Sequence, residues 1–579
     1  MIERINNIGV ANRKNDNIKP VRKNKANPNF NGRLVDATVK GIQKCEKNPM
    51  LNVAVIDLAT AIVPRSIWES FTNIFAGFEA FRRESSGLIV NCLLPGFVAL
   101  GAAKAVNKSI MGKNADLSAC WAGKDSINTV ADYYQNAENT PAFQEGINKF
   151  NDAKKAKVYA THYNMLADAS GFDGDKKVKF GDISELNIAE NAEKLTNATF
   201  QEPKKMNVSE RLSNLFKQKD KNLVDEAYES IASKTHITEN INFGKGSNTV
   251  TSDLKSALTN TKTLLKGFVK DGVETKEQVG AFTKKAKKLV GAKGVIAMAV
   301  IIPVAASMQA INRWITTKMS GVKGAPIYDD YAKKDKIVKT PEQQKEEKSA
   351  LLKQKIISIG SMVGVACLSM MKLPTVKNLK SILEFKGQFP TMDQARAIST
   401  VTFASRMAVA DDKNELAEAT TRDIVTFSSM YFLGDYAAKG YASYLENKDG
   451  VKLLNRTKPA KKDSNIFKKI GNWVVNTHLK STDELAADGV RSLEEMKHLR
   501  AKCQMANLGT SLLILGLIVP VFTRLKTEKN HKKDLLEQNK RIQNVTNSEN
   551  NSNFHDFEVF KYLRTDSEKN PTFQSFKRS

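Results

Sequence analysis

The stretch CQMANLGTSLLILGLIVPVFT, from Cys503 to Thr523, contains 21 residues and no charged side chain. Lys502 precedes it and Arg524 follows it. Because an α-helix rises about 1.5 Å per residue, a run of this length covers the ~30 Å hydrocarbon layer of a bilayer. The stretch therefore predicts a transmembrane helix, and the rest of the chain is interpreted around it.

Three further runs lack charged residues, and they are Ser85 to Ala103, Gly294 to Asn312 and Ile356 to Met371. Pro95 and Pro303 lie near the middle of the first two, a position that neighbouring helices make tolerable inside a membrane. We expect an all-α fold, a helical integral membrane protein with about four candidate spans and soluble helical modules. Two alternatives stay open: re-entrant insertion of the proline-containing runs, and a soluble protein whose apolar runs are core helices.

Composition limits the class of protein and its partners. The chain has 579 residues, a formal net charge of +27 and a mean hydropathy of −0.38, so several domains are expected and most residues lie in water. The positive charge favours anionic lipid headgroups or nucleic acid as partners. Because the basic residues are spread among acidic ones, without the aromatic-interleaved patch of RNA-binding proteins, we expect the lipid bilayer, with anionic lipids, rather than nucleic acid.

The N-terminal part divides into two predicted segments. Residues 1–48 form a disordered basic segment without a secretory signal, since the first 47 residues hold 11 Lys/Arg, four Asp/Glu and no hydrophobic period. Residues 49–106 hold apolar and amphipathic helices, including the candidate span 85–103. Within them, a helix over residues 67–81 would place four aromatic residues on one face, either at a bilayer surface or in a protein core: Trp68, Phe71, Phe75 and Phe78.

The remaining segments are predicted from the same patterns. Residues 107–290 form a soluble helical region, in which no alternating strand pattern stands out. The later segments are 291–373 with two candidate spans (294–312 and 356–371) joined by a basic helical loop, 374–502 with amphipathic helices, 503–523 with the strongest transmembrane helix, and 524–579 as a polar, partly disordered tail. Pro341 after Thr340 predicts the start of a helix that runs into 356–371. Gly360 and Gly364 form a GxxxG pattern, which lets another helix approach closely.

Charge predicts the orientation of the spans. Four crossings would place both termini and the segment Arg313 to Lys355 on one side of the membrane, with 104–293 and 372–502 on the other. The segment Arg313 to Lys355 holds 11 Lys/Arg and six Asp/Glu. Positive residues in short connections mark the cytoplasmic side. We therefore expect a multi-pass membrane protein with cytoplasmic termini.

The sequence shows no pattern typical of catalysis. The five cysteines contain no CxxC pair, and three lie in uncharged runs, which favours buried thiols over disulfides or a metal site: Cys45, Cys92, Cys120, Cys367 and Cys503. The six histidines lack metal-ligand spacing. The segment GKGS at Gly244 lacks the remaining residues of a P-loop, and no GxSxG motif occurs. We expect no enzyme activity and no catalytic, metal or cofactor site.

One loop resembles a calcium-binding motif. The segment DGDKKVKFGD, from Asp173 to Asp182, is similar to the latter part of an EF-hand loop, with alternating carboxylates, a hydrophobic residue and a final acid. It departs from the pattern at three positions: Gly171 replaces the first acid, Lys176 the sharp-turn glycine, and the shorter Asp182 the closing glutamate. We therefore expect a solvated loop, with calcium binding as the alternative.

Three acidic residues lie in or beside apolar stretches: Asp57, Asp423 and Asp435. A carboxylate at membrane depth is costly and often functional. We expect all three at helix ends or on solvated faces, with a proton or ion relay as the alternative. The function predicted from these patterns is that of a non-enzymatic structural or interaction component of a membrane. A transporter or pore-forming protein is the alternative, and a soluble basic helical protein that binds nucleic acid is a further one.

Overall fold

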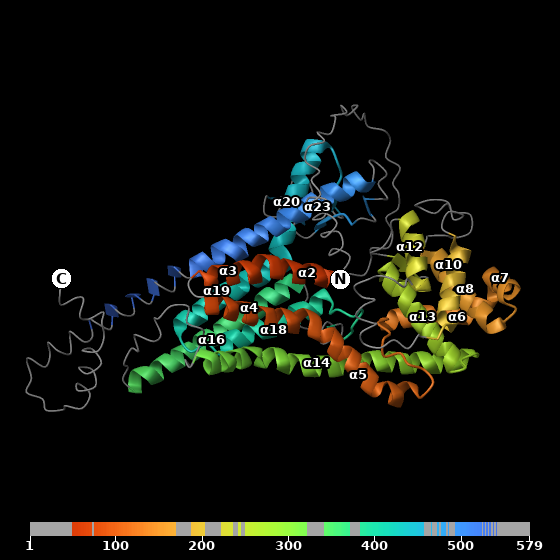
Figure 1. The fold of residues 1–579 in the computed structure, drawn as a ribbon, viewed down its shortest axis with the longest axis horizontal. Coiled ribbons are helices and arrows are strands. Elements are labelled where there is room, and N and C mark those ends of the chain that lie inside the picture. Colours follow the sequence, from red (N-terminus) through yellow and green to blue (C-terminus); the bar gives the residue numbers. More distant parts are fainter. Residues whose placement is uncertain are drawn as a thin grey trace, which may run out of the picture.

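The computed structural model describes residues 49–71, 74–169, 187–202, 222–235, 241–244, 249–320, 341–370, 382–456 and 493–523, with short pieces between 465 and 485 and between 525 and 540. Helices dominate these residues (Figure 1), which confirms the predicted all-α class. Three parts can be distinguished: a long helical bundle, a helical domain at one end of it, and a small module of helices and strands.

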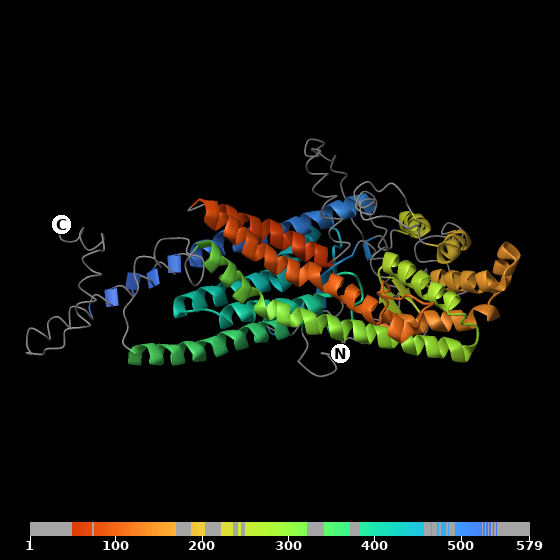
Figure 2. The ribbon, with the colours of Figure 1, turned by 60° about the horizontal axis from the view of Figure 1, so that its bottom comes forward.

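Seven helical segments form the bundle among the described residues, and several change from α- to π-helix along their length. They are α2–η2–α3 (Pro49–Asp57, Leu58–Ile62, Val63–Ser70), α4–η3–α5 (Ile74–Leu88, Ile89–Leu93, Leu94–Met111), α14 (Lys276–Ser320), α16 (Pro341–Met370), α18 (Met392–Ala408), α19–η6–α20 (Lys413–Ser428, Ser429–Leu433, Gly434–Asp449) and α23–η7 (Leu493–Ser511, Leu512–Ile518). Figure 2 shows most of them side by side along the long axis of the molecule. The start of α16 at Pro341 and its continuation through 356–370 agree with the sequence prediction.

The prediction of a single helix over residues 67–81 is wrong. The helix α3 ends at Ser70 and α4 begins at Ile74, so the aromatic residues of that stripe belong to the two arms of a helical hairpin. Thr72 and Asn73, which connect the arms, are weak helix formers, and Asn favours turns. An ion pair of 2.9 Å between Arg65 and Glu84 joins the two arms.

Four helices are long and apolar enough to cross a membrane by length and composition: Ile74–Met111, Lys276–Met319, Lys345–Met370 and Glu495–Thr523. They contain three of the four uncharged runs and residues 356–370 of the run 356–371. This confirms the expectation of about four candidate spans in an all-α fold.

The four uncharged runs lie at one level of the bundle. Glu79, Arg82 and Ser86 of α4 contact Thr316 and Asn312 of α14 in reverse order. These helices are therefore antiparallel, and the middles of 85–103 and 294–312 face each other. Further contacts extend this level to the other helices: Asn91 with Thr402 (2.9 Å), Ser399 with Tyr431 (3.0 Å), Lys355 with the Ala408 carbonyl (2.8 Å), and Gly434 against Asn507. At equal rise per residue, the middles of 356–371 and 503–523 fall within about one helical turn of the same level.

The bundle exposes apolar side chains and buries polar ones. At the level of the uncharged runs, Phe97 is 64% exposed, Leu368 77% and Leu513 52%. The central helix α18, in contrast, buries Gln394 and Thr402. Membrane bundles have this distribution, because lipid accepts apolar side chains and the interior supplies partners for polar ones.

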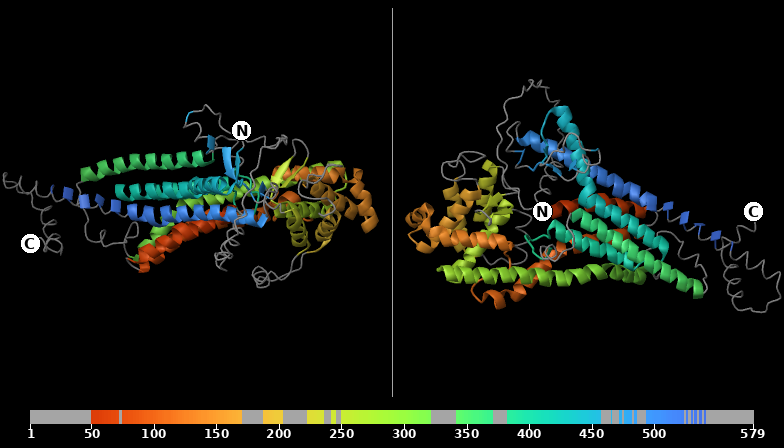
Figure 3. Two further views of the ribbon diagram at one scale, coloured as in Figure 1. Left: turned by 90° about the horizontal axis from the view of Figure 1, so that it is seen from above. Right: turned by 180° about the vertical axis from the view of Figure 1, so that it is seen from behind.

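The helical domain is built from α6 (Lys124–Asn136), η4 (Ala137–Asn139), α7 (Pro141–Phe150), α8 (Ala153–Ala169), α10 (Ile188–Phe200), α12 (Leu223–Thr235), α13 (Leu254–Lys270) and the first half of α14. Figure 3 shows it at one end of the bundle. It has two apolar cores, one around Phe268 and Phe282 and the other around Tyr159 and Leu258. The sequence prediction of a helical region over 107–290 missed one antiparallel pair, β1 (Ile241–Phe243) with β2 (Val250–Ser252). Three-residue strands are too short to produce a recognisable alternation.

The helix α14 belongs to both parts. Its first half contributes Phe282 and Leu289 to a core of the domain, and its second half contributes Ala297 and Ile301 to a core of the bundle. With 45 residues, it is about 68 Å long. The domain and the bundle are therefore joined by continuous helix as well as by loops.

A connecting segment packs into a slot between α5 and α14. A Cβ atom on Gly96 would lie 1.7 Å from the Gln388 carbonyl oxygen, and one on Gly294 would lie 1.6 Å from the Leu383 carbonyl oxygen. Only glycine permits this approach of a backbone to the two helices. In contrast, the GxxxG glycines Gly360 and Gly364 are exposed, with no atom within 4 Å of the position of an added Cβ.

The small module lies beside α20 and α23. It contains the antiparallel pair β3 (Leu454–Arg456) with β4 (Thr477–Leu479), and its core includes Ala442, Leu453 and Cys503. The sequence prediction of amphipathic helices over 374–502 holds for α18, α19 and α20 but missed these strands.

The outer ends of α2 and η7, the first and last described helical elements of the bundle, lie on opposite sides of it. In Figure 1, α2 begins on the side of the helical domain, whereas η7 ends at the opposite end of the bundle. This arrangement arises from the segment 49–70, which lies along the bundle although Asp57, Arg65 and Glu69 exclude it from the apolar runs. Residues 1–48, the loop 171–182 and the tail beyond 540 lie outside the described residues, as does most of the segment joining α14 to α16.

Candidate functional site

Six charged side chains form an alternating series inside the bundle, which we name the charge chain. It consists of Arg65, Glu84, Arg406, Asp423, Arg422 and Glu418. The successive nitrogen–oxygen distances are 2.9 Å for Arg65–Glu84, 3.5 Å for Glu84–Arg406, 2.6 Å for Arg406–Asp423, 3.2 Å for Asp423–Arg422 and 3.8 Å for Arg422–Glu418. Three cations alternate with three carboxylates, so the series carries no net charge when all six groups are ionised.

Four elements supply the charge chain, namely α3, α4, α18 and α19. Arg406 is central, because it contacts Glu84 of α4 and Asp423 of α19 from the last turn of α18. The Asp423 side chain is 1% exposed and the Arg406 side chain 9%. An ion pair removed from water needs such close partners to offset its desolvation. The charge chain therefore fixes the relative positions of four elements.

The charge chain lies near one end of the uncharged runs. Glu84 immediately precedes the run 85–103, and the Ala408 carbonyl next to Arg406 accepts a hydrogen bond from Lys355, which precedes the run 356–371. One nitrogen of Arg406 (Nε) and one oxygen of Asp423 (Oδ2) are buried without a hydrogen-bond partner among the described residues. The centre of the series thus keeps one donor and one acceptor that a small polar group would satisfy.

A second polar network joins α4 to α14 near the charge chain. Arg82 donates to Asn312 (3.1 Å) and to Thr316 (3.2 Å), and Asn312 donates to Ser86 (3.0 Å). Just beyond it, Arg313 pairs with Asp411 and Glu415 at the start of α19. Most arginines at this end of the bundle are thus neutralised by carboxylates.

Four π-helical segments gather near the middle level of the bundle. Among the described contacts, η2 packs on η7, and α2 packs on η3 and η6. A π-turn inserts an extra residue into a helix and often occurs at functional sites. Asp57 ends α2 immediately before η2 and is half-buried. This places one of the three acids noted in the sequence among the π-helical segments.

The expectation that all three acids lie at helix ends or on solvated faces is wrong for Asp423, which is buried in the charge chain. Its partner Arg406 is 17 residues away on another helix, a pairing that helical periodicity does not reveal. For Asp435 the expectation holds, because its side chain is 54% exposed and pairs with Lys439 at 2.7 Å. Asp57 lies inside the continuous helical segment α2–η2–α3 and is half-buried, so the expectation is wrong for Asp57 as well.

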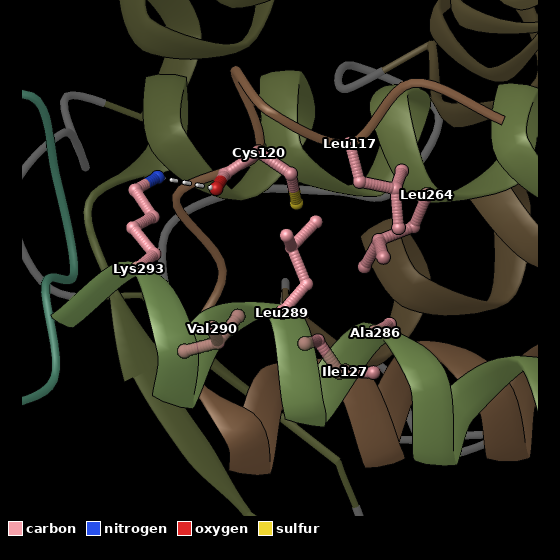
Figure 4. A pocket seen from close by; sticks show the side chains of 8 residues that line it. All are labelled: Leu117, Cys120, Ile127, Leu264, Ala286, Leu289, Val290 and Lys293. Carbon is pink, nitrogen blue, oxygen red and sulfur yellow. Dashed lines mark hydrogen bonds between the residues drawn. The ribbon is translucent and has the colours of Figure 1, made fainter. Parts of the chain in front are cut away.

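A small pocket lies where the helical domain meets α14 (Figure 4). Lys293 is 2% exposed, and its ammonium group donates to the Cys120 carbonyl (3.0 Å) and lies 3.2 Å from the centre of the Trp121 ring. The pocket has a volume of about 10 Å³ and is lined mainly by Leu, Ile, Val and Ala. That volume holds at most a water molecule, so Lys293 attaches the loop before α6 to α14 and does not form a ligand site.

The helical domain contains a buried histidine. His162 Nε2 lies 3.2 Å from the Thr199 hydroxyl, which itself donates to the Leu195 carbonyl at 2.8 Å. The hydroxyl therefore accepts a hydrogen bond from Nε2–H, which defines the tautomer. Burial lowers the pKa of His162 to about 3, so the ring is neutral at physiological pH. His162 is thus a core residue of the domain.

The cysteines that the structure describes lie in the helices and in the loop before α6. Cys92 and Cys120 are buried free thiols, Cys503 is buried, and Cys367 is half-buried. Among the described residues, no group of three or more His, Cys, Asp or Glu side chains is placed to hold a metal ion. The loop Asp173 to Asp182, which resembles part of an EF-hand, lies outside the described residues.

The comparisons with known proteins identify no relative. No protein-family model, curated protein or solved structure matches this chain. The arrangement of its own residues is therefore the basis for a functional proposal.

Proposed function

We propose that this protein is a multi-spanning membrane scaffold, a non-enzymatic component that holds a helical domain against one face of a bilayer. The observation that carries the proposal is α14, a single helix that contributes to a core of the domain and to a core of the apolar bundle. A helix shared by two cores resists bending between them, so the domain keeps a fixed position relative to the bundle.

The interior of the bundle supports this role. The charge chain connects four elements through specific partners, and removal of Arg406 leaves Glu84 and the buried Asp423 with one cation fewer each. The aligned uncharged runs and their exposed apolar side chains match the lipid-facing surface that such a scaffold requires.

Membrane fractionation tests the proposal. We expect the full-length protein to remain in the membrane pellet after extraction with alkaline carbonate and to enter the detergent phase on phase partitioning. A soluble membrane-associated protein of the same host serves as the extracted control. Recovery of the full-length chain in the carbonate supernatant would exclude a spanning scaffold.

Labelling of single cysteines tests the placement of the domain. In a variant without the five native cysteines, Lys154→Cys reports on the helical domain and Lys413→Cys on the turn between α18 and α19. Both side chains are exposed. In sealed vesicles, a membrane-impermeant maleimide is expected to label one position directly and the other only after permeabilisation. Direct labelling of both would contradict a bundle that spans the bilayer. The accessible position also tests the predicted cytoplasmic location of Arg313 to Lys355.

Transport is the second candidate function, favoured by the π-helical segments gathered around Asp57. Under this proposal Asp57 carries the exchangeable proton or binds the ion, because carboxylates within spans commonly do so. Ion and proton flux into liposomes containing the purified protein measures the activity. Asp57→Asn is expected to abolish flux, whereas Asp435→Asn, which alters an exposed carboxylate, leaves it unchanged. Absence of flux in the wild-type protein would exclude transport of these ions and leave the scaffold proposal intact.

A further inference from the structure

Exposed lysines gather just beyond the uncharged runs, at the end of the bundle that carries the helical domain. We name this set the lysine belt: Lys104 and Lys108 on α5, and Lys284, Lys285 and Lys288 on α14. Because α5 and α14 are antiparallel neighbours, the contacts of Arg82 and Ser86 with Asn312 extend to place Lys108 level with Lys288.

The lysines of the belt are directed away from the protein, in contrast to two other lysines of the same stretch. Lys287 donates to Asn128, and Lys293 is buried against backbone carbonyls. Among the described residues, none of the five belt lysines forms an ion pair, and nearby Asp116 and Glu384 accept hydrogen bonds from Ser118 and from the Lys124 backbone instead. The belt is thus a surface of unneutralised positive charge.

The distance of the belt from the uncharged runs matches the headgroup layer of a bilayer. Lys104 directly follows the run 85–103, Lys108 lies about 6 Å further along α5, and Lys288 lies about 9 Å before the run 294–312. Headgroups occupy roughly 5–8 Å on each side of the hydrocarbon layer. Lys284 and Lys285 lie about 14 Å before the run, roughly 6–9 Å outside the headgroup layer.

At the opposite end of the bundle, Arg313, Arg82 and Arg406 are paired with carboxylates. The exposed lysines Lys318 and Lys353 also lie beside the uncharged runs there. Exposed positive charge is therefore present at both ends of the spans, and the belt is its part on the domain side. Phosphates of anionic lipids are the partners that fit this position and this charge.

We infer that the lysine belt binds the headgroups of anionic phospholipids in the leaflet on the domain side. This inference rests on the proposed membrane scaffold and adds a lipid partner to it. Lys104, Lys108 and Lys288 make the main contribution, because they lie closest to the headgroup layer. The bound lipid keeps the helical domain close to the membrane surface.

Lipid retention by the full-length protein tests the inference. The protein is reconstituted in vesicles of equimolar phosphatidylglycerol and phosphatidylcholine, extracted in mild detergent, and its retained lipids are quantified by mass spectrometry. We expect the wild type to retain several times more phosphatidylglycerol than phosphatidylcholine. In the triple variant Lys104→Gln, Lys108→Gln, Lys288→Gln, the ratio is expected to approach one. The double variant Lys284→Gln, Lys285→Gln is expected to change the lipid ratio less than the triple variant does.

The matched control removes three lysines from the helical domain, Lys154→Gln, Lys194→Gln and Lys255→Gln. These side chains already pair with carboxylates at 2.7 to 3.0 Å, so the variant changes the total charge equally without altering the belt. It is expected to retain the wild-type lipid ratio. Equal loss of the preference in the belt and control variants would contradict a specific belt and indicate an effect of net charge.

Three further measurements distinguish lipid binding from misfolding, from nucleic-acid binding and from failure of the proposed scaffold. The triple variant Lys104→Arg, Lys108→Arg, Lys288→Arg preserves the charge and is expected to preserve the lipid ratio, which guards against misfolding as an explanation. Inorganic phosphate or a short RNA added before extraction is not expected to displace the lipid, and displacement by RNA would overturn the inference in favour of a nucleic-acid surface. Carbonate extraction of the belt variant reports separately on the scaffold: a variant that stays in the membrane but loses the lipid ratio supports both proposals. An unchanged ratio overturns only the lipid inference.

Discussion

At the residue scale, Arg406 has the greatest structural consequence in the bundle, because it lies between two carboxylates from different helices. Its guanidinium group is 2.6 Å from Asp423 and 3.5 Å from Glu84. A buried ion pair adds little net stability compared with apolar packing, but loss of one partner leaves the other charge uncompensated. Arg406 therefore determines which arrangement of the helices is permitted.

Replacement of Arg406 tests this role. We expect Arg406→Met to destabilise the protein by about 3–5 kcal/mol, since Asp423 and Glu84 lose a buried cation. Thermal unfolding in detergent, followed by circular dichroism, measures the effect. Lys149→Gln removes an exposed pair with Glu193 and is expected to cost less than about 1 kcal/mol. Similar losses in both variants would show that the charge chain has no special structural role.

The neutral state of His162 predicts a pH dependence of stability. The folded-state pKa, about 3, is below the ordinary value of 6.5. The unfolded chain therefore binds a proton that the folded chain excludes, and stability falls as pH decreases from about 6.5 toward 3, by about 1.4 kcal/mol per pH unit. Between pH 6.5 and 5, where few carboxylates titrate, His162→Gln is expected to flatten this slope in chemical unfolding. His498→Gln, at an exposed position, serves as the control, and an equal slope in wild type and His162→Gln would contradict the assignment.

The sequence could predict the types of residue involved but not their partners. Asp423 and Arg406 were recognisable as charged residues near apolar stretches, and a cost for their burial follows from general principles. Their pairing depends on the turn between α18 and α19, and the addition of Glu84 depends on a separate hairpin far earlier in the chain. Such contacts are long-range in sequence, so hydropathy and periodicity do not reveal them.

At the scale of single elements, α14 depends on glycine at the junction between its two halves. Gly294 faces the Leu383 carbonyl, whereas Gly291, one turn earlier, has only the Lys124 ammonium group nearby at 3.9 Å. The two glycines lie in the same helix but differ in what a side chain would meet. The close approach of the segment 382–391 is the physical reason for glycine at position 294.

These two positions form a matched test. Gly294→Ala is expected to destabilise the protein by at least about 1–3 kcal/mol, because the new methyl group overlaps a backbone carbonyl. Gly291→Ala is expected to be neutral or to stabilise by up to about 1 kcal/mol, since alanine favours helix. Thermal unfolding of both variants measures the difference. If Gly294→Ala stabilised the protein, the close packing of the segment 382–391 between α5 and α14 would be excluded.

Among the elements, the long apolar helices were predictable and the breaks between short ones were not. The start of α16 at Pro341 followed from a known preference of proline for the first helical turn. The hairpin between α3 and α4 was missed because the aromatic residues continue the helical period through Thr72 and Asn73. The paired strands were missed because three residues are too few to show alternation.

At the scale of the whole molecule, the common level of the uncharged runs is the strongest structural support for a membrane location. Each run is defined by its own sequence, yet contacts between different helices bring their middles to one level. The sequence predicted the number of candidate spans from length and charge. It could not show that three helical segments of higher polarity lie among the candidate spans. These segments, α2–η2–α3, α18 and α19–η6–α20, are buried by their neighbours in the bundle, and their own hydropathy does not predict this.

Depth measurements on single cysteines test whether the uncharged runs lie at one level in the bilayer. In the variant without native cysteines, spin labels at Phe97, Val300 and Leu513, which are all exposed, are expected to show high accessibility to oxygen and low accessibility to a water-soluble nickel complex. Phe97 and Val300 should lie at the same depth, and Leu513 within about two helical turns of them, roughly 10 Å. A label at Lys154 on the helical domain provides the aqueous control. A large difference in depth between Leu513 and the other two would exclude a common slab.

In the proposed membrane scaffold, the continuity of α14 also makes the position of the domain sensitive to the membrane itself. A bilayer whose hydrocarbon layer is thinner than the apolar half of a helix favours tilting of that helix. Because the other half of α14 lies in a core of the domain, the domain must move with any such tilt. The spacing between the domain and the membrane surface then depends on lipid chain length, so this helix would act as a gauge of bilayer thickness.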